Sequence, residues 1–250
     1  MKNQTTRTAH IITQGKGGVG KSKAASDLTQ ALRHLKGTAA AYDTDAVNRT
    51  LSRTRSLGAI PIELLDESMQ INPRNFDNLI AQLIESDHDA VIDVGSNGFL
   101  PLMNYLATSG AVEFLRMNGV DVLLHIIVAG GDELTDTTSG MVMMMDLVDA
   151  PAVIWMNEHF GPVAKNGKAL VDTTIFQDRA HRIRGTITMP RHDAATTGRD
   201  LAEMKELGLT YEEAMAHPKF AGMPGFRVLR VWNQILDSVA TAIRHEEATA

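Results

Sequence analysis

A glycine-rich segment near the N-terminus carries two lysines and a serine. Residues 15–22 read GKGGVGKS and fit the pattern G-x-x-x-x-G-K-[ST]. The glycines let successive backbone N–H groups turn towards phosphate oxygens, Lys21 can reach the β- and γ-phosphates, and the Ser22 hydroxyl can bind Mg²⁺. The alternative, a simple glycine-rich turn, would match by chance in about one chain in a hundred. We therefore predict phosphate contacts from Gly15, Gly17, Gly18, Val19, Gly20, Lys21 and Ser22.

Three carboxylates follow at the ends of expected strands. Asp43 ends the strand expected at residues 38–43, Asp45 follows two residues later, and Asp93 ends the run Ala-Val-Ile-Asp. Mg²⁺ keeps several waters and takes few protein ligands, so Ser22 and Asp93 suffice beside phosphate oxygens. Asp43 and Asp45 could instead be turn or capping residues, and Asp93 could end its strand only to be solvated.

The loop carries a further lysine, Lys16, that a general phosphate loop does not need. The pattern K-G-G-x-G-K-[ST] resembles the deviant Walker A loop of the MinD/ParA family. The resemblance implies that two subunits enclose two ATP molecules and that Lys16 reaches the partner's nucleotide. It further implies that Asp45 orients the attacking water, that Asp43 supports the Mg²⁺ shell, and that Lys16, Lys21 and Asp45 act in slow ATP hydrolysis. The alternative for Lys16 is a surface lysine without a catalytic task. Family members usually have proline after the second aspartate, where this chain has Ala46.

Two residues bear on the choice of base. The apolar residues 152–157 end in Asn157, where the family often places an asparagine that reads adenine. Pro190 occupies the place of a loop that commonly packs on the base. The chain has no [NT]-K-x-D segment of the kind that reads guanine. We expect ATP with Mg²⁺, although Asn157 could merely cap its strand.

Longer stretches resemble the TraL subgroup, whose members are encoded with conjugative plasmid transfer genes. Where partition ATPases usually have D-x-P after the Walker B strand, this chain has Asp93-Val94-Gly95, as TraL-like sequences do. The resemblance implies protein partners in a conjugative transfer system. A partition ATPase that binds DNA, and a nucleotide-gated interaction protein with negligible hydrolysis, remain alternatives. The matching stretches are residues 14–22, 43–52, 91–106 and 153–163.

Alternating apolar runs and helical patterns must position these residues. They predict an α/β fold, a mainly parallel sheet with helices on both faces, of the P-loop MinD/ParA type. We read residues 1–250 as a single domain. Strands are expected at residues 8–13, 38–43, 60–65, 90–94, 121–129, 152–157 and 183–189. Helices are expected at residues 21–36, 75–85, 100–118, 133–148, 168–180, 197–207 and 226–245.

Composition excludes several classes. The 250 residues have 44% apolar content, which can form a full core, and no cysteine, so thiolate zinc and iron–sulfur sites are excluded. No segment reaches the length of a membrane helix, so we expect a cytoplasmic protein without membrane insertion. The net charge of -6 is uneven: residues 1–60 carry ten Lys/Arg against three acids. Five arginines in residues 179–199 could touch DNA phosphates, but the overall charge favours a solvated or nucleotide-adjacent face.

Overall fold

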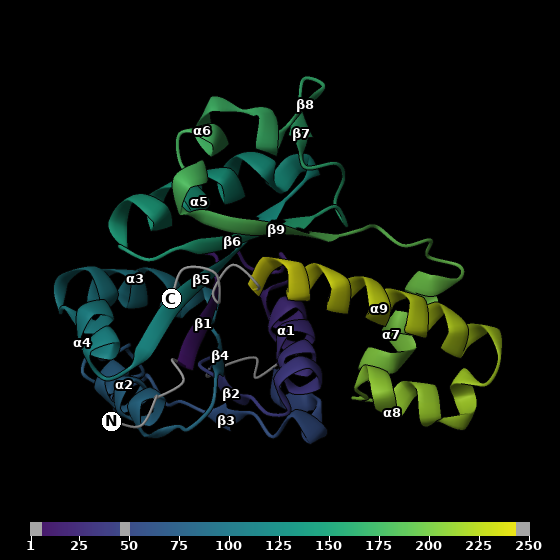
Figure 1. Ribbon diagram of the computed structural model, residues 1–250, viewed down its shortest axis with the longest axis horizontal. Coiled ribbons are helices and arrows are strands. Elements are labelled where there is room, and N and C mark those ends of the chain that lie inside the picture. The colour runs from purple at the N-terminus through teal and green to yellow at the C-terminus, as the bar shows by residue number, and fades with distance from the viewer. Residues whose placement is uncertain (1–6, 46–50, 244–250) are drawn as a thin grey trace.

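The computed structural model describes residues 7–45 and 51–243. Its described strands form a seven-stranded sheet in the order β3-β2-β4-β1-β5-β6-β9, and every adjacent pair is parallel. This confirms the α/β prediction (Figure 1). The strands are β1 (Arg7–Thr13), β2 (Ala40–Asp43), β3 (Ile60–Pro61), β4 (Ala90–Asp93), β5 (Val120–Ala129), β6 (Ala152–Asn157) and β9 (Ile183–Met189).

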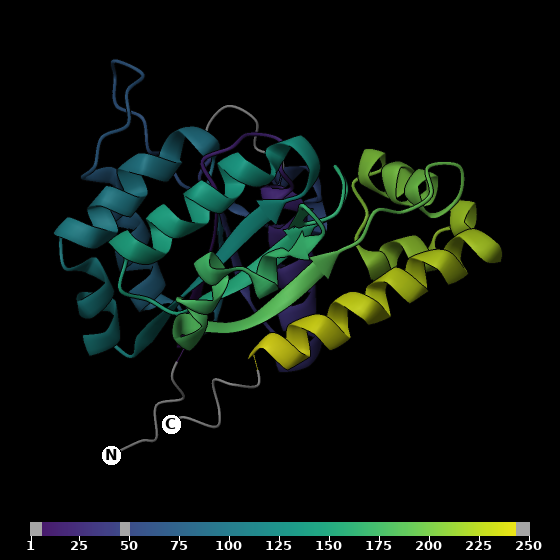
Figure 2. The same ribbon diagram turned by 90° about the horizontal axis from the view of Figure 1, so that it is seen from above.

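Helices cover both faces of the sheet, as Figure 2 shows from above. Neighbouring side chains of β1 point to opposite faces, so Ile11 joins one hydrophobic core and Ile12 the other. The first core is covered by α2 (Asn75–Glu85), α3 (Phe99–Thr108), α4 (Ala111–Met117) and α5 (Leu134–Leu147). The second is covered by α1 (Lys21–Lys36), α7 (Thr197–Glu206), α8 (Tyr211–Ala216) and α9 (Met223–Ile243).

Strand register brings the predicted site residues to one edge. Asp93 pairs with Ile12 of β1 on one side and with Asp43 of β2 on the other. Asn157 pairs with Met189 of β9. Because all these strands are parallel, the loops after their carboxyl ends meet at the same edge of the sheet.

The prediction of one continuous helix over residues 100–118 is wrong. The structure has two helices there, α3 and α4, separated by Ser109 and Gly110. Gly110 has a φ of 72°, in the left-handed region that glycine adopts without steric strain. The chain therefore turns at Gly110.

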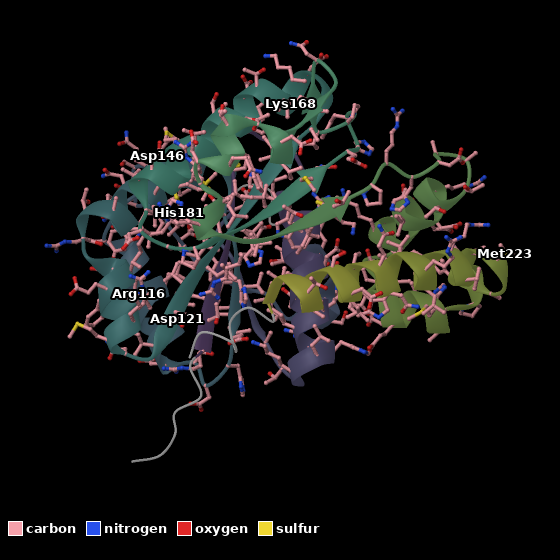
Figure 3. All side chains as sticks on the ribbon, turned by 45° about the horizontal axis from the view of Figure 1, so that its top comes forward. Arg116, Asp121, Asp146, Lys168, His181 and Met223 are labelled. Carbon is pink, nitrogen blue, oxygen red and sulfur yellow. The ribbon has the colours of Figure 1, made fainter. Side chains whose placement is uncertain are left out.

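The predicted helix over residues 168–180 is also wrong. A short antiparallel hairpin forms instead from β7 (Ala164–Lys165) and β8 (Lys168–Ala169). Asn166 and Gly167, with φ values of 53° and 76°, form its two-residue turn. The segment continues as η5 (Leu170–Asp172), α6 (Thr174–Gln177) and η6 (Ala180–Arg182). Figure 3 shows Lys168 at the projecting end of the hairpin, far from Met223 at the start of α9.

Other boundaries also differ from the predictions. β3 ends at Pro61, which pairs with Asp43, the last residue of the neighbouring strand β2. Helix α8 was not predicted, although Thr210 and Glu213 form a capping box at its start. Helix α9 begins at Met223 rather than Phe226, and the last two predicted residues of that helix lie outside the described part. No helix within the described ranges is long and apolar enough to cross a membrane.

A row of polar rings crosses the second core. The Trp155 indole Nε1 donates to His125 Nδ1 at 2.9 Å, and His125 Nε2 lies 2.9 Å from His10 Nδ1. All three side chains are fully buried. Because an indole N–H can only donate, His125 Nδ1 must accept, which leaves His125 Nε2 to carry the proton towards His10. The hydrogen bonds therefore require a neutral His125.

Candidate functional site

The glycine-rich segment forms a loop between β1 and α1. Gly18 and Gly20 have φ values of 76° and 99°, in the left-handed region. At Gly20 a Cβ atom would also lie 3.0 Å from Asn157 Nδ2. Helix α1 begins at Lys21, so its positive dipole end and its unpaired N–H groups face the loop. This arrangement suits a bound anion.

Lys21 points back over this loop. Its Nζ donates to the backbone oxygen of Lys16 at 2.9 Å, and only 8% of the residue is exposed. Burial lowers the pKa of Lys21, while the charges of Asp93 and Asp45 oppose that shift. A phosphate group beside the buried ammonium would stabilise its charged form.

Gln14 anchors the start of the loop. Its Nε2 donates to the backbone oxygens of Ile127 at 2.7 Å and Thr137 at 3.0 Å, and its Oε1 accepts from Gly15 N at 2.9 Å. Gly140 of α5 makes room for this amide, because a Cβ there would lie 2.3 Å from Gln14 Oε1. Gln14 was not predicted as a site residue, since Ile127 and Thr137 lie more than a hundred residues away in the sequence.

Lys16 forms ion pairs within its own chain. Its Nζ lies 3.0 Å from Glu133 Oε2 and 3.0 Å from Asp136 Oδ2. Glu133 ends η4 (Gly131–Glu133) and Asp136 lies in the first turn of α5. These two carboxylates raise the pKa of Lys16. The two lysines of the loop therefore point to different places: Lys21 over the loop, and Lys16 towards α5.

Asp93 is the most perturbed carboxyl of the site. Burial raises its pKa to about 7, and the charges of Asp43 and Asp45 act in the same direction, while Ser22 and Lys21 favour the charged form. Its Oδ2 is buried, and no described residue hydrogen-bonds it. Carboxylate and hydroxyl oxygens are the donors that Mg²⁺ prefers, so Asp93 and Ser22 fit that ion. Among the described residues no cluster of three or more His, Asp or Glu ligands occurs, and Mg²⁺ does not need one.

Asp43 is used within the chain. Its Oδ1 accepts from Asp45 N at 3.1 Å, and its Oδ2 accepts from Ser52 Oγ at 3.0 Å and Ser52 N at 3.3 Å. Asp43 thus connects Asp45 with Ser52 of η1 (Leu51–Arg53). Asp45 lies beside Gly95 and lines the cleft that begins at the phosphate loop. Ala46 lies outside the described residues.

Asn157 and Pro190 lie on the other side of the loop. Asn157 Nδ2 donates to Val19 O at 2.9 Å, and its Oδ1 accepts from His159 N at 3.0 Å. The Asn157 amide therefore holds the phosphate loop in place through its hydrogen bond to Val19. Both residues line the same cleft, whose volume is about 2000 Å³. Typical small-molecule sites measure about 300–1,000 Å³, so the cleft exceeds the needs of one nucleotide.

A further ion pair, between the partly exposed Lys23 and the buried Asp27, lines this cleft and was not predicted. Lys23 Nζ lies 2.5 Å from Asp27 Oδ2 and donates to Tyr211 OH at 2.8 Å. Tyr211 OH lies 3.1 Å from Asp27 Oδ1, and its ring stacks on Trp232 with centroids 4.9 Å apart. The cluster thereby ties α8 and α9 to the first turns of α1.

The arginines of residues 179–199 have different roles. Arg179 pairs with Asp146 at 2.8 Å. Arg182 donates to the backbone oxygen of Ala150 at 2.8 Å and to those of Met145 and Val148. These two arginines hold the end of α5, whereas Arg199 lines the cleft.

A glycine-rich loop between the central parallel strand and α1, with acids at the ends of the two next strands, defines a P-loop protein of the MinD/ParA fold type. In agreement, the fold is similar to the MinD cell division protein of Aquifex aeolicus, with a TM-score of 0.53, 17% identity and 98% of each chain covered.

Sequence comparison gives a narrower assignment. A protein TraL of Escherichia coli is 32% identical over 235 residues, 93% of this chain and 97% of that protein. A second Escherichia coli protein TraL is 33% identical over 209 residues, 83% of this chain and 86% of that protein. No family model matches the chain. The chain belongs to the TraL family, and the predicted resemblance is confirmed.

Proposed function

We propose that this protein binds Mg-ATP, forms a homodimer around it and hydrolyses it slowly as a switch. The buried carboxyl of Asp93 carries the proposal. It has an oxygen that no described residue hydrogen-bonds, and it lies near Ser22 and Lys21 at the start of α1. Ser22 and Asp93 would hold Mg²⁺, which supplies charge neutralisation at the phosphate oxygens when bound. Asp43 would support the surrounding water shell.

The other residues of the site take separate roles in this proposal. The loop amides and Lys21 bind the β- and γ-phosphates, and Lys21 exchanges the carbonyl of Lys16 for phosphate oxygen. Asn157 and Pro190 border the place proposed for adenine. Asp45 orients the attacking water. Lys16 leaves Glu133 and Asp136 and neutralises charge on the partner subunit's nucleotide.

The likeness to TraL proteins supports a role in conjugative plasmid transfer. There the nucleotide state would decide whether a protein of the transfer system is bound. We propose the transfer system as the source of partners because the two relatives match 93% and 83% of the chain.

Light scattering and phosphate release, with and without ATP, test the proposal. We expect the wild type to dimerise with ATP, Lys21→Ala to lose ATP binding, and Lys16→Ala to bind ATP as a monomer without turnover. Asp45→Ala should accumulate as an ATP-bound dimer. Equal turnover in the Lys16→Ala protein would contradict the shared site, and normal hydrolysis by Asp45→Ala would contradict the role of that carboxylate.

Two other outcomes would indicate a different function. ATP-dependent dimers without phosphate release would favour an interaction switch that does not hydrolyse ATP. Salt-sensitive, ATP-dependent binding to DNA would favour a partition ATPase.

A further inference from the structure

Gly95 makes room for Asp45. A Cβ atom on Gly95 would lie 3.1 Å from the Cα, Cβ and Cγ atoms of Asp45. The backbone of Gly95, with φ -57° and ψ 148°, is open to any residue. The glycine is therefore required by space rather than by backbone conformation. A side chain at this position would push Asp45 away by a few tenths of an ångström.

Thr44 joins the same two segments through hydrogen bonds. It is 4% exposed, and both its N–H, at 3.0 Å, and its Oγ1, at 3.1 Å, donate to the backbone oxygen of Asp93. The same hydroxyl accepts from Gly95 N at 3.4 Å. One side chain thus connects the end of β2 with the residues that follow β4.

These contacts place Asp45 from two sides. The Asp45 N–H donates to Asp43 Oδ1 at 3.1 Å, while Thr44 holds the preceding peptide against Asp93. Gly95 allows the Asp45 side chain to lie directly against the Asp93 strand. The carboxylates of Asp45 and Asp93 therefore lie at the ends of two strands that Thr44 connects.

We propose that Thr44 and Gly95 are positioning residues that fix Asp45 relative to Asp93. The inference rests on the proposed function in that Asp45 orients the attacking water there. Placement of a reacting group to within about an ångström can change a rate by about a hundredfold. Loss of either positioning residue should therefore lower kcat while ATP binding is kept.

Two substitutions and two matched controls test this inference. Gly95→Ala introduces the close contact, whereas Gly98→Ala, three residues further on at the end of η3 (Ser96–Gly98), meets its nearest atoms at 3.6 Å or more. Thr44→Val removes the hydroxyl at nearly constant volume, and Thr44→Ser keeps it. We expect kcat to fall at least about tenfold in Gly95→Ala and Thr44→Val, with KM for ATP within about twofold of wild type. Gly98→Ala and Thr44→Ser should stay within about threefold of the wild-type kcat.

Hydrogen exchange of the backbone amides gives a readout that does not need turnover. In Gly95→Ala and Thr44→Val without nucleotide, the amides of residues 45 and 95 should exchange at least about fivefold faster, as expected for a lost hydrogen bond. The controls should exchange at wild-type rates. Wild-type exchange at both amides in both variants would overturn the inference, whether or not the wild type hydrolyses ATP. An absence of wild-type turnover would count against the proposed function alone.

Discussion

The ammonium of Lys16 lies 3.0 Å from the carboxylate of Glu133 in the same chain. Asp136 holds the same ammonium at an equal distance of 3.0 Å. A lysine proposed to act on a partner's nucleotide is therefore occupied by two acids of its own subunit. The proposed dimer around ATP would have to break these ion pairs, so they would oppose its formation.

Removal of both acids should favour the ATP-bound dimer. Glu133→Gln combined with Asp136→Asn frees Lys16 without changing the size of either side chain. Because exposed ion pairs contribute little, we expect the concentration for half dimerisation with ATP to fall by about three- to tenfold. Light scattering over a protein dilution series measures it. Asp132→Asn, which neutralises an exposed acid of the same turn, is the control. Unchanged or weaker dimerisation of the double variant would refute the competition.

Asp93→Asn should stabilise the protein without nucleotide. The folded pKa of about 7 lies above the ordinary value of 3.8, so the folded state holds this proton more tightly than the unfolded chain. The carboxyl therefore destabilises the fold above pH 4, and increasingly so towards pH 7. We expect the Asn variant to gain roughly 1–2 kcal/mol at pH 7.5, or about 2–8 °C in Tm, and no more than a small gain at pH 5. A loss of stability at pH 7.5 would show that the carboxylate has a partner in the free protein.

Mg²⁺ should compete with the same proton. Below a pH of about 7 the Asp93 carboxyl is largely protonated, so Mg-dependent ATP binding should weaken by up to about tenfold per pH unit. Calorimetric titrations between pH 6 and 8.5 measure the effect. ATP binding with EDTA is the control, because it should change much less. The same slope with EDTA would assign the titration to a different group.

His125 should remain neutral in the folded protein. Burial, followed by the charge of His10, lowers its pKa well below the ordinary value of 6.5. The unfolded chain therefore takes up a proton as the pH falls below about 6.5, and this site removes up to about 1.4 kcal/mol of stability per pH unit. Nitrogen-15 NMR should show His125 protonated on Nε2 alone from pH 8 to 5.5. A doubly protonated ring at pH 6 would contradict the hydrogen-bond direction from Trp155.

Tyr211→Phe should weaken the attachment of α8 to α1. The substitution removes the hydroxyl that meets Lys23 and Asp27 but keeps the ring that stacks on Trp232. We expect a loss of about 1 kcal/mol in the free energy of unfolding, measured by denaturant titration. Tyr105→Phe is a matched control, because its hydroxyl bonds Asp77 at the surface. It should lose less than about 0.5 kcal/mol, and equal losses in both variants would show that burial of the Tyr211 cluster contributes nothing.

The sequence predicts well those features that depend on neighbouring residues. The phosphate loop, the strand that ends in Asp93 and helix α1 each carry their signal within a few residues, and the structure has each element where it is expected. Asn166-Gly167 is also a local signal, because Asn-Gly is typical of a two-residue hairpin turn. The helix predicted at residues 168–180 did not take this signal into account. Gly110 was likewise read as part of a helix.

Contacts between distant segments could not be predicted. Lys16 and Asp136 are 120 positions apart, and Gln14 and Thr137 are 123 apart. Nothing near Lys16 in the sequence indicates which acids the fold brings to it. The roles of Gly95 and Gly140 were hidden for the same reason, because each glycine accommodates a residue from another part of the chain.

The side chain of Gln14 occupies the space that a Cβ atom on residue 140 would need, so the two positions depend on each other. Glycine inside a helix costs about 0.5–1 kcal/mol relative to alanine, and α5 carries one where the Gln14 amide needs its space. A relative with a shorter residue at position 14 has no such need, so a larger residue at position 140 becomes favourable there. The two positions should therefore covary among homologues. Alanine at position 140 should be harmful in this protein but beneficial once residue 14 is serine, a reversal of sign that constrains the order in which the two changes can arise.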